Sequence, residues 1–279
     1  MLSALVSIKK PSDNSNDFYR CFYNCYNMLQ VSDFVLRECY SKCSNRDDLI
    51  KQITEGCNGN EYKDARIFTM CMGLNLKGLE ERDNEVRGFE NFFIDELIKQ
   101  KEDPIEWYLK VNEFILLYAY TDQGLKSFLR YKGKDKLFRE NQLMRFVCDV
   151  LKETNIKEDF LKKINLLSNS VISDEDTLIK VWDYFTKIRN LFMHSGGFIT
   201  EKFVCDLKEL KLPIGKKLMN IDTGLDLIWN SSESSGDEFL FKFSLEPQKL
   251  FIITENFINF FRNFVLIILE SLDEFYKKS

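Results

Sequence analysis

The only histidine of the chain, His194, closes the segment RNLFMH at residues 189–194, which combines a fixed cation, an amide and a titratable imidazole. On a helix Asn190 and His194 are neighbours at i and i+4. Arg189 lies about 140° round the helix from His194, a gap that a long guanidinium side chain can bridge. Imidazole has an unperturbed pKa of about 6.5, which suits general acid or base catalysis. Attack of a ribose 2′-hydroxyl on a phosphodiester needs such a group together with positive charge at the phosphate.

The cysteines form the second group of residues that could do chemistry. Cys21, Cys25, Cys39 and Cys43 make two C-x3-C pairs. A helical hairpin folded near Ser32 would place Cys25 opposite Cys39 and Cys21 opposite Cys43, which suits two disulfides or a four-thiolate zinc site. Packed thiols are the usual state of cytosolic cysteines, so three interpretations stay open: plain thiols, a disulfide or redox set, and a metal site.

Composition favours a mainly helical fold. The chain has 279 residues, with 44% apolar and 14% aromatic side chains but only 4 Pro and 12 Gly. This content supports a real hydrophobic core and disfavours disorder and turn-dense β-sandwiches. The net charge of −5 gives no global attraction for a polyanion, so nucleic-acid binding would require a local basic patch.

Apolar periodicity and turn signals give the expected elements. The charged run EERDNE at 80–85 divides the chain into a cysteine-rich helical N-terminal region, 1–84, and a helical domain, 85–279. Alternating apolar residues on either side of a Ser-rich turn predict a small β-hairpin over about 225–245. The fold class is thus all-α, a mainly helical bundle with a β-hairpin before the C-terminal helix. Helices are expected over 17–30, 33–43, 47–56, 86–97, 107–129, 140–152, 173–195 and 248–276.

The helix over 173–195 carries the RNLFMH segment and has signals at both ends. Ser173 and Asp176 form a capping-box pattern, which predicts that the helix opens at Ser173. The sequence Ser195-Gly196-Gly197 is a strong helix stop. The segment is therefore expected in the last turns of a well-defined helix.

Neither the most apolar segment nor the N-terminus predicts a membrane protein. Residues 251–269 are interrupted by polar residues such as Arg262, so a buried core helix is expected rather than a membrane span. At the N-terminus an apolar stretch precedes Lys9 and Lys10, the reverse of the order in a secretory signal. A cytoplasmic location without membrane contact is expected.

Common enzyme signatures are absent. The chain has no Walker A loop, G-x-G-x-x-G, G-x-S-x-G, H-E-x-x-H or EF-hand loop, which disfavours the corresponding phosphate, dinucleotide, hydrolase and metal sites. A single histidine also excludes a histidine-rich metal site within one protomer. No cofactor is expected.

The segment Arg189-Asn190-x-x-x-His194, followed by Ser-Gly-Gly, resembles the R-x4-6-H signature of the HEPN superfamily (higher eukaryote and prokaryote nucleotide-binding domains). Residues 114–126 are similar to an earlier helix of that family, in which an acidic residue, here Asp122, faces the motif. The expected hairpin and final helix agree with larger bacterial members. The resemblance covers about residues 85–279.

This resemblance implies an all-α homodimer in which two Arg189/His194 sets meet at a composite cleft. There RNA is cleaved without metal to leave a 2′,3′-cyclic phosphate. His194 would be the general acid or base, Arg189 would hold the phosphate, Asn190 would orient the motif, and Asp122 would position Arg189 or His194. The implied biology is a toxin or antiphage defence effector acting by abortive infection, with tRNA or mRNA as substrate and an antitoxin or regulatory protein as partner. One toxin subfamily is nucleotidylated on a Tyr two residues after the His; Gly196 stands there, so this modification is not expected.

Two other functions stay open. One is a catalytically silent HEPN-like module that binds RNA or a protein. The other is a thiol or zinc regulatory protein centred on the two C-x3-C pairs.

Overall fold

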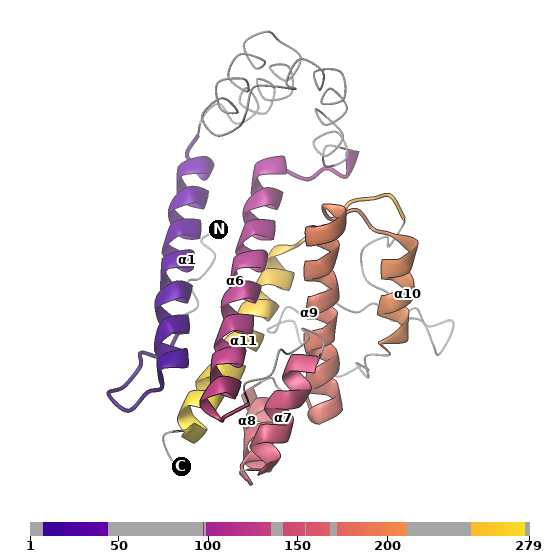
Figure 1. The fold of residues 1–279 in the computed structure, drawn as a ribbon. Coiled ribbons are helices and arrows are strands. Elements are labelled where there is room, and N and C mark those ends of the chain that lie inside the picture. The colour runs from indigo at the N-terminus through magenta and orange to yellow at the C-terminus, as the bar shows by residue number, and fades with distance from the viewer. Residues whose placement is uncertain are drawn as a thin grey trace, which may run out of the picture. The chain divides into compact units, whose positions relative to one another are not determined.

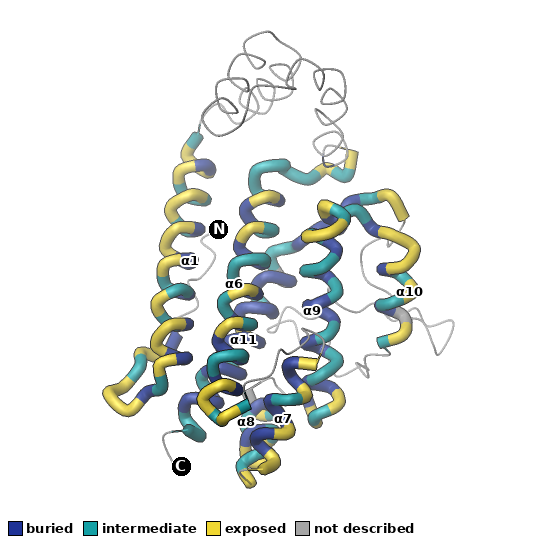
Figure 2. Tube along the Cα trace, in the orientation of Figure 1, coloured by how far each residue is buried: buried dark blue, intermediate teal, exposed yellow. Residues whose placement is uncertain are grey.

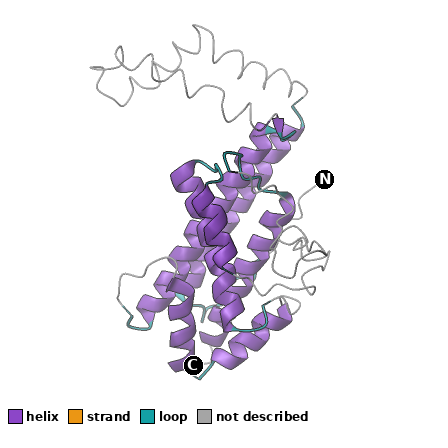
Figure 3. Cartoon of the chain, turned by 90° about the vertical axis from the view of Figure 1, so that its right-hand side faces the viewer, coloured by secondary structure: helices purple, strands orange, loops and turns teal. Residues whose placement is uncertain are grey.

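The computed structural model describes residues 8–43, 97, 99–134, 142–153, 155–167, 172–210 and 247–276. This part of the chain is mostly helical, which confirms the predicted all-α character, and Figure 3 shows helices and loops but no strand in it. The predicted β-hairpin over 225–245 lies outside the described residues. The helices are α1 (Asp17–Ser41), α6 (Pro104–Tyr131), α7 (Leu143–Glu153), α8 (Lys157–Leu167), α9 (Glu175–Ser195), α10 (Glu201–Glu209) and α11 (Glu255–Tyr276) (Figure 1).

The chain forms two compact units. The larger comprises residues 1–34 and 109–279, and the smaller comprises residues 35–108. In the smaller unit the Tyr40 hydroxyl donates to both carboxylate oxygens of Asp103, at 2.8 and 2.9 Å. Asp103 also accepts from the backbone N–H of Ile105 and thereby caps α6. The predicted boundary after residue 84 lies outside the described residues. The N-terminal residues up to Phe34 belong to the same unit as residues 109–279 of the predicted second domain.

An aromatic core joins the helices of the larger unit. The Phe185 ring of α9 lies 4.5 Å from the Phe261 ring of α11, and the Phe114 ring of α6 lies 4.9 Å from Phe261, measured between centroids. On α1, Phe18 packs edge-on against Phe128 of α6 at 5.6 Å. Figure 2 shows α11 buried along much of its length, as expected for the most apolar segment. The apolar faces of α1, α6, α9 and α11 therefore form the core of this unit.

Helix α1 corrects the predicted pair of short helices. The interruption expected at Val31 and Ser32 is wrong, because α1 runs unbroken through both residues. Neither residue is a Gly or Pro, so the backbone hydrogen bonds of the helix continue. Val31 is apolar but 59% exposed, which explains why the apolar periodicity breaks there although the helix does not.

The ends of α9 match the sequence signals in part. The stop is confirmed: Gly196 and Gly197 have φ angles of 59° and 89°, in the left-handed region that favours glycine. The start is wrong by one residue, because the N-cap is Asp174 rather than Ser173. The Asp174 carboxylate accepts from the Thr177 N–H at 2.8 Å, and the Ser173 hydroxyl donates to Asp174 and does not act as the capping acceptor. A carboxylate is a stronger acceptor than a hydroxyl, and the helix N-terminus favours its charge.

The predicted helix start at Gln248 is also wrong, because α11 begins only at Glu255. Gln248 has a φ of 73°, and its N–H donates to the Ile199 carbonyl at 2.8 Å. The Ile199 N–H in turn donates to Lys249, and Phe251 donates to Gly197. These bonds tie the residues that follow α9 to those that precede α11 and so help to position the end of α9.

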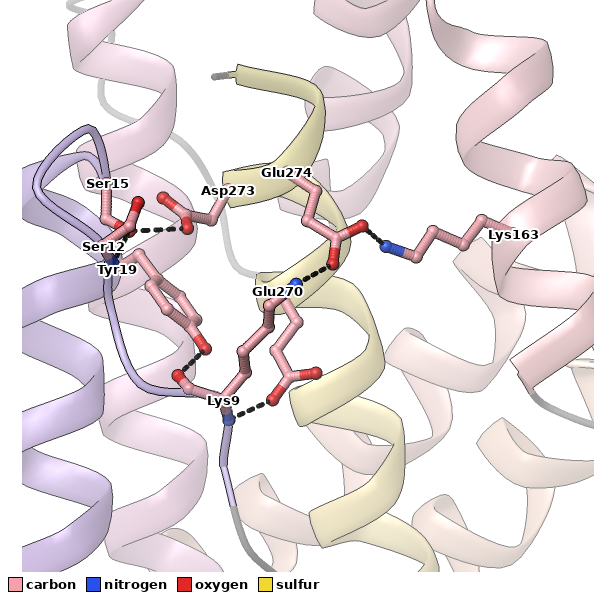
Figure 4. A network of polar contacts seen from close by, with 8 residues as sticks. All are labelled: Lys9, Ser12, Ser15, Tyr19, Lys163, Glu270, Asp273 and Glu274. Carbon is pink, nitrogen blue, oxygen red and sulfur yellow. Dashed lines mark hydrogen bonds and ion pairs between the residues drawn. The ribbon is translucent and has the colours of Figure 1, made fainter. Parts of the chain in front are cut away.

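A polar network fastens residues 9–15 to the last turns of α11 (Figure 4). The Lys9 ammonium and the Lys163 ammonium of α8 both pair with the Glu274 carboxylate. The Lys9 N–H donates to Glu270 at 2.8 Å, and the Ser15 hydroxyl donates to Asp273 at 3.0 Å.

Among the described helices none is long and apolar enough to cross a membrane.

Candidate functional site

Helix α10 lies beside α9 (Figure 1). A groove with a volume of about 870 Å³ runs along the face of α9 that meets α10. The residues of α9 that line the groove form a single stripe along that helix, which is called the α9 wall. The lining residues of α10 form the facing side, which is called the α10 wall. The lining residues of the groove are Lys126 of α6, Asp183, Thr186, Lys187, Asn190, Leu191, His194 and Ser195 of α9, Thr200 before α10, and Lys202, Phe203, Asp206, Glu209 and Leu210.

The two walls run in opposite directions. The Lys187 ammonium of α9 lies 3.7 Å from the Asp206 carboxylate of α10, so this pair links the walls in the middle of the groove. Lys202, in the first turn of α10, therefore lies towards the His194 end of the groove. Glu209, in the last turn, lies towards Asp183. The end with His194 carries the Lys202 ammonium and is called the cationic end, and the opposite end carries the carboxylates of Asp183 and Glu209.

The cationic end contains two of the predicted site residues. His194 is exposed in the last turn of α9, and Asn190 lies one turn earlier on the same stripe. Thr200 caps α10 by accepting from the Phe203 N–H at 3.1 Å. The first turn of α10, with its partial positive charge, therefore opens at this end of the groove. An imidazole, an amide, an ammonium and a helix N-terminus line the same space.

Arg189 lies outside the groove. Its guanidinium donates from Nη1 to the Asn190 side-chain oxygen at 2.8 Å, and its Cζ lies 5.8 Å from the centre of the Tyr118 ring on α6. Asn190 thus connects Arg189 to the groove that His194 lines. Within one chain the structure brings Asn190 and His194 to the groove but does not bring the Arg189 side chain there.

Asp122 lies on α6, one turn after Tyr118 and one turn before Lys126. Its Oδ2 accepts from the Lys126 ammonium at 2.6 Å, and its Oδ1 is buried with no hydrogen-bond partner in the described part of the chain. Lys126 lines the groove, so Asp122 influences it through this ion pair. The predicted direct role of Asp122 in positioning Arg189 or His194 stays a prediction.

Asp183 is a groove residue that the sequence interpretation missed. Its Oδ1 is also buried without a partner among the described residues. Burial raises the pKa of Asp183 to about 6, against the opposing effects of Lys187 and of Arg145 on α7. Asp183, Lys187, Asn190 and His194 follow one another at i, i+4, i+7 and i+11, so a polar stripe on α9 was visible in the sequence and could have revealed the groove.

The two C-x3-C pairs do not form the predicted hairpin. Both pairs lie on or directly after the single helix α1, and Cys25 and Cys39 are fourteen positions apart, or about 21 Å along the helix. That separation is far beyond the range of a disulfide or a shared metal. Cys21, Cys25, Cys39 and Cys43 are free thiols, and no group of three or more potential metal ligands occurs among the residues that the structure describes.

Comparison of the chain with family models, with curated proteins and with solved structures gave no match. The likeness to HEPN proteins therefore depends on the residues of the R-x4-H segment and their surroundings alone.

Proposed function

We propose that the protein is a metal-independent endoribonuclease. The observation that carries the proposal is the opening of Asn190 and His194 of the R-x4-H segment into one groove beside Lys202 and the N-terminus of α10. The function implied by the HEPN resemblance is the one that these groups fit best.

The groove supplies the chemistry that cleavage needs. In the proposed reaction the ribose 2′-oxygen attacks the adjacent phosphorus while its proton passes to a base, and the bond from phosphorus to the 5′-oxygen breaks as that oxygen gains a proton. His194 serves one of these proton transfers. Lys202 and the first N–H groups of α10 stabilise the charge on the phosphate oxygens. The fragments carry a 2′,3′-cyclic phosphate and a 5′-hydroxyl.

The net charge of −5 gives the whole chain no attraction for RNA, so binding requires a local positive charge. Lys202 has no ion-pair partner among the described residues, so its charge is available for a phosphate. A second chain would add Arg189 to the site if two copies meet as the HEPN resemblance implies. In that arrangement Arg189 binds the phosphate and Asn190 holds its guanidinium in place.

The experiment is incubation of the purified protein with total RNA and tRNA in EDTA, followed by analysis of the fragment ends. We compare the wild type with His194→Ala, Arg189→Ala and the control Met193→Ala. Met193 is 53% exposed, adjoins His194 and does not line the groove, so its substitution tests for a general disturbance of this helix end.

The expected result is cyclic-phosphate ends for the wild type and Met193→Ala, and a loss of about 10²- to 10⁴-fold for His194→Ala. Binding of RNA without cleavage would favour a catalytically silent module. Cleavage that His194→Ala retains, or that EDTA abolishes, would show that the proposed mechanism is wrong.

A further inference from the structure

Helix α1 carries a second apolar face, which is exposed. Its inner face packs into the core through residues such as Phe22 and Tyr26, which are 2% and 1% exposed. Another face of the same helix carries Met28, Val31 and Val35, which are 72%, 59% and 50% exposed. A helix at the surface of a globular protein normally has one apolar face, which is turned towards the core. The second face of α1 therefore needs a separate explanation.

The exposed apolar side chains gather on this helix. Of the large apolar side chains that are exposed in the described part of the chain, four lie on α1, two on α6 and one each on α8 and α9. Figure 2 shows exposed positions recurring along α1. Single apolar residues on a surface are normal, whereas a contiguous row of them marks a surface that binds a partner. Helix α1 carries such a row.

The spacing of this row is that of a helix that packs lengthwise against another helix. Steps of four and three residues alternate along it, which gives the 3.5-residue repeat of a coiled-coil seam. Helix α1 has 25 residues, or about three and a half such heptads, which is about the length that a coiled-coil pattern needs. We call this row the outer stripe of α1. All its residues are exposed except the partly exposed Glu38, and they are Asp17, Cys21, Asn24, Met28, Val31, Val35, Glu38 and Lys42.

The charges at the two ends of the outer stripe favour a second copy of this chain as the partner. Asp17 begins the stripe and Lys42 ends it, so two copies that run in opposite directions place each Asp17 beside the Lys42 of the other copy. Two copies that run in the same direction would bring like charges together and align their helix dipoles. Lys42 lies 2.9 Å from Glu38 of its own chain, but its side chain is 76% exposed and can pair with a further carboxylate. The stripe is therefore complementary to itself in the antiparallel direction alone.

We propose that two copies of the chain associate through the outer stripe of α1, with the two helices antiparallel. No residue of the stripe lines the groove that contains His194, so this surface is separate from the candidate site. The inference does not depend on the proposed ribonuclease activity. The surface also differs from the composite cleft of Arg189 and His194 that the HEPN resemblance implies.

One register satisfies the charges and the apolar residues together. When Asp17 faces Lys42 of the other copy, Met28 of each copy faces Val31 of the other at the middle of the pair. This reciprocal contact is what a twofold axis requires. The apolar seam is short, because Asn24 and Glu38 interrupt it towards its ends. The association should therefore be reversible and depend on protein concentration.

The first test is sedimentation velocity of the whole protein under reducing conditions, from micromolar to submillimolar concentrations. We compare the wild type with Val31→Lys and with the control Leu166→Lys. Leu166 is on α8, is 75% exposed and lies outside the stripe, so the control makes a similar change elsewhere on the surface. Circular dichroism checks that each variant keeps its helix content.

We expect self-association that increases with concentration for the wild type and for Leu166→Lys. Val31→Lys should weaken it by about tenfold or more, because the twofold axis places two ammonium groups against apolar side chains. A wild type that stays monomeric at every concentration overturns the proposal. Association that Val31→Lys retains in full overturns it as well, because the copies would then meet elsewhere.

Crosslinking tests the direction of the pair. Cys21 and Cys39 are free, exposed thiols eighteen positions apart on α1, or about 27 Å, so a short bismaleimide can join them only between two chains. In the antiparallel pair Cys21 of one copy lies near Cys39 of the other. The variant Cys25→Ser/Cys43→Ser is used, because the thiol four residues after each reporter would otherwise capture the linker.

We expect a covalent dimer on a denaturing gel, in which mass spectrometry finds peptides that join Cys21 to Cys39. Links that join Cys21 to Cys21 and Cys39 to Cys39 would show a parallel pair. That result, or no link between Cys21 and Cys39 at concentrations where the protein self-associates, overturns the antiparallel pairing.

Discussion

Glu113 and Asp183 are carboxylates on neighbouring helices of the same bundle, yet their surroundings differ completely. Glu113 of α6 is fully buried, and Arg262 of α11 donates to both its oxygens, at 2.5 and 2.8 Å. Gln30 of α1 adds a third donor at 2.9 Å. Asp183 faces the groove with one oxygen that no described residue satisfies.

The difference separates a structural carboxylate from an available one. Both oxygens of Glu113 have donors, so its ion pair with Arg262 links α6 to α11 and its hydrogen bond from Gln30 links α6 to α1. Around Asp183 burial opposes ionisation and the nearby cations compensate only in part, as the raised pKa of about 6 shows. Replacing the carboxylate by the isosteric amide should therefore lower the unfolding free energy at Glu113 and leave it unchanged or raise it at Asp183.

The largest effect is expected for Glu113→Gln. The amide cannot balance the Arg262 guanidinium, which is only 2% exposed and keeps only the more distant carboxylate of Glu255, at 3.8 Å, so a poorly compensated charge is left in the core. Breaking a buried pair by removing one partner costs about 3–5 kcal/mol of unfolding free energy. Urea denaturation monitored by circular dichroism measures this loss. The double variant Glu113→Gln/Arg262→Met removes the orphaned charge and should recover part of the stability. A single variant as stable as the wild type would mean that the pair does not define the core.

A smaller effect is expected for Glu274→Gln, which breaks a network that is satisfied but partly open to water. Glu274 is 34% exposed and pairs with both Lys9 and Lys163, and the loss should be about 1 kcal/mol because solvent screens these pairs. Hydrogen bonds from the two lysines lower the pKa of Glu274 to about 2. Because the folded-state pKa lies below the unfolded value, the stabilisation is present at neutral pH and is lost as the pH falls from about 4.5 towards 2.

Urea denaturation at neutral and at acidic pH tests this, with Glu153→Gln as the control. Glu153 pairs with Lys134 at a more exposed site and should change stability little. The wild type and Glu274→Gln should converge in stability at low pH. A constant difference between them would show that the charge of Glu274 is not what stabilises the network.

Of the two helices that form the walls of the groove, the sequence predicts α9 but not α10. Helix α9 could be predicted because an apolar stripe, a polar start and a double glycine stop agree. Helix α10 was missed because its nine residues make only about two and a half turns, too short a stretch for an apolar period to stand out in the sequence. Since the groove needs both walls, the positions of Lys202 and Glu209 could not be foreseen.

Tertiary contacts explain the other differences. Exposed Val31 interrupted the apolar pattern of α1, so one helix looked like two and the cysteines looked paired. The start of α11 depends on two backbone hydrogen bonds with Ile199, one that Gln248 donates and one that Lys249 accepts. Ile199 is far away in the sequence, so no local pattern contains these bonds. Burial of an oxygen without a donor, as in Asp183, is likewise a property of the packed molecule.

Asp122→Asn lies between the two extremes of the comparison. Asp122 has one satisfied oxygen, bonded to Lys126, and one buried oxygen without a partner in the described residues. Losing the charge removes a half-buried ion pair but also relieves the unpaired oxygen, so destabilisation should be only about 0.5 kcal/mol. Urea denaturation measures it against Asp176→Asn, an equivalent i,i+4 pair with Lys180 that is far more exposed and should show no change. A loss as large as that of Glu113→Gln would place Asp122 among the structural carboxylates.

The smallest effect, and the only one of opposite sign, is expected for Asp183→Asn. The pKa of Asp183 is raised, so the folded state binds a proton that the unfolded state has already released between about pH 4 and pH 6. The charged carboxylate therefore lowers stability as the pH rises through this range, and asparagine avoids that cost. We expect Asp183→Asn to be no less stable than the wild type at neutral pH, with a gain below about 1 kcal/mol because the site is partly open to solvent. Urea denaturation across the range should show the advantage growing up to about pH 6 and then levelling off. If Asp183→Asn instead destabilised the fold at neutral pH, the Asp183 carboxylate would have a structural partner. The unsatisfied oxygen that distinguishes Asp183 from Glu113 would then not exist.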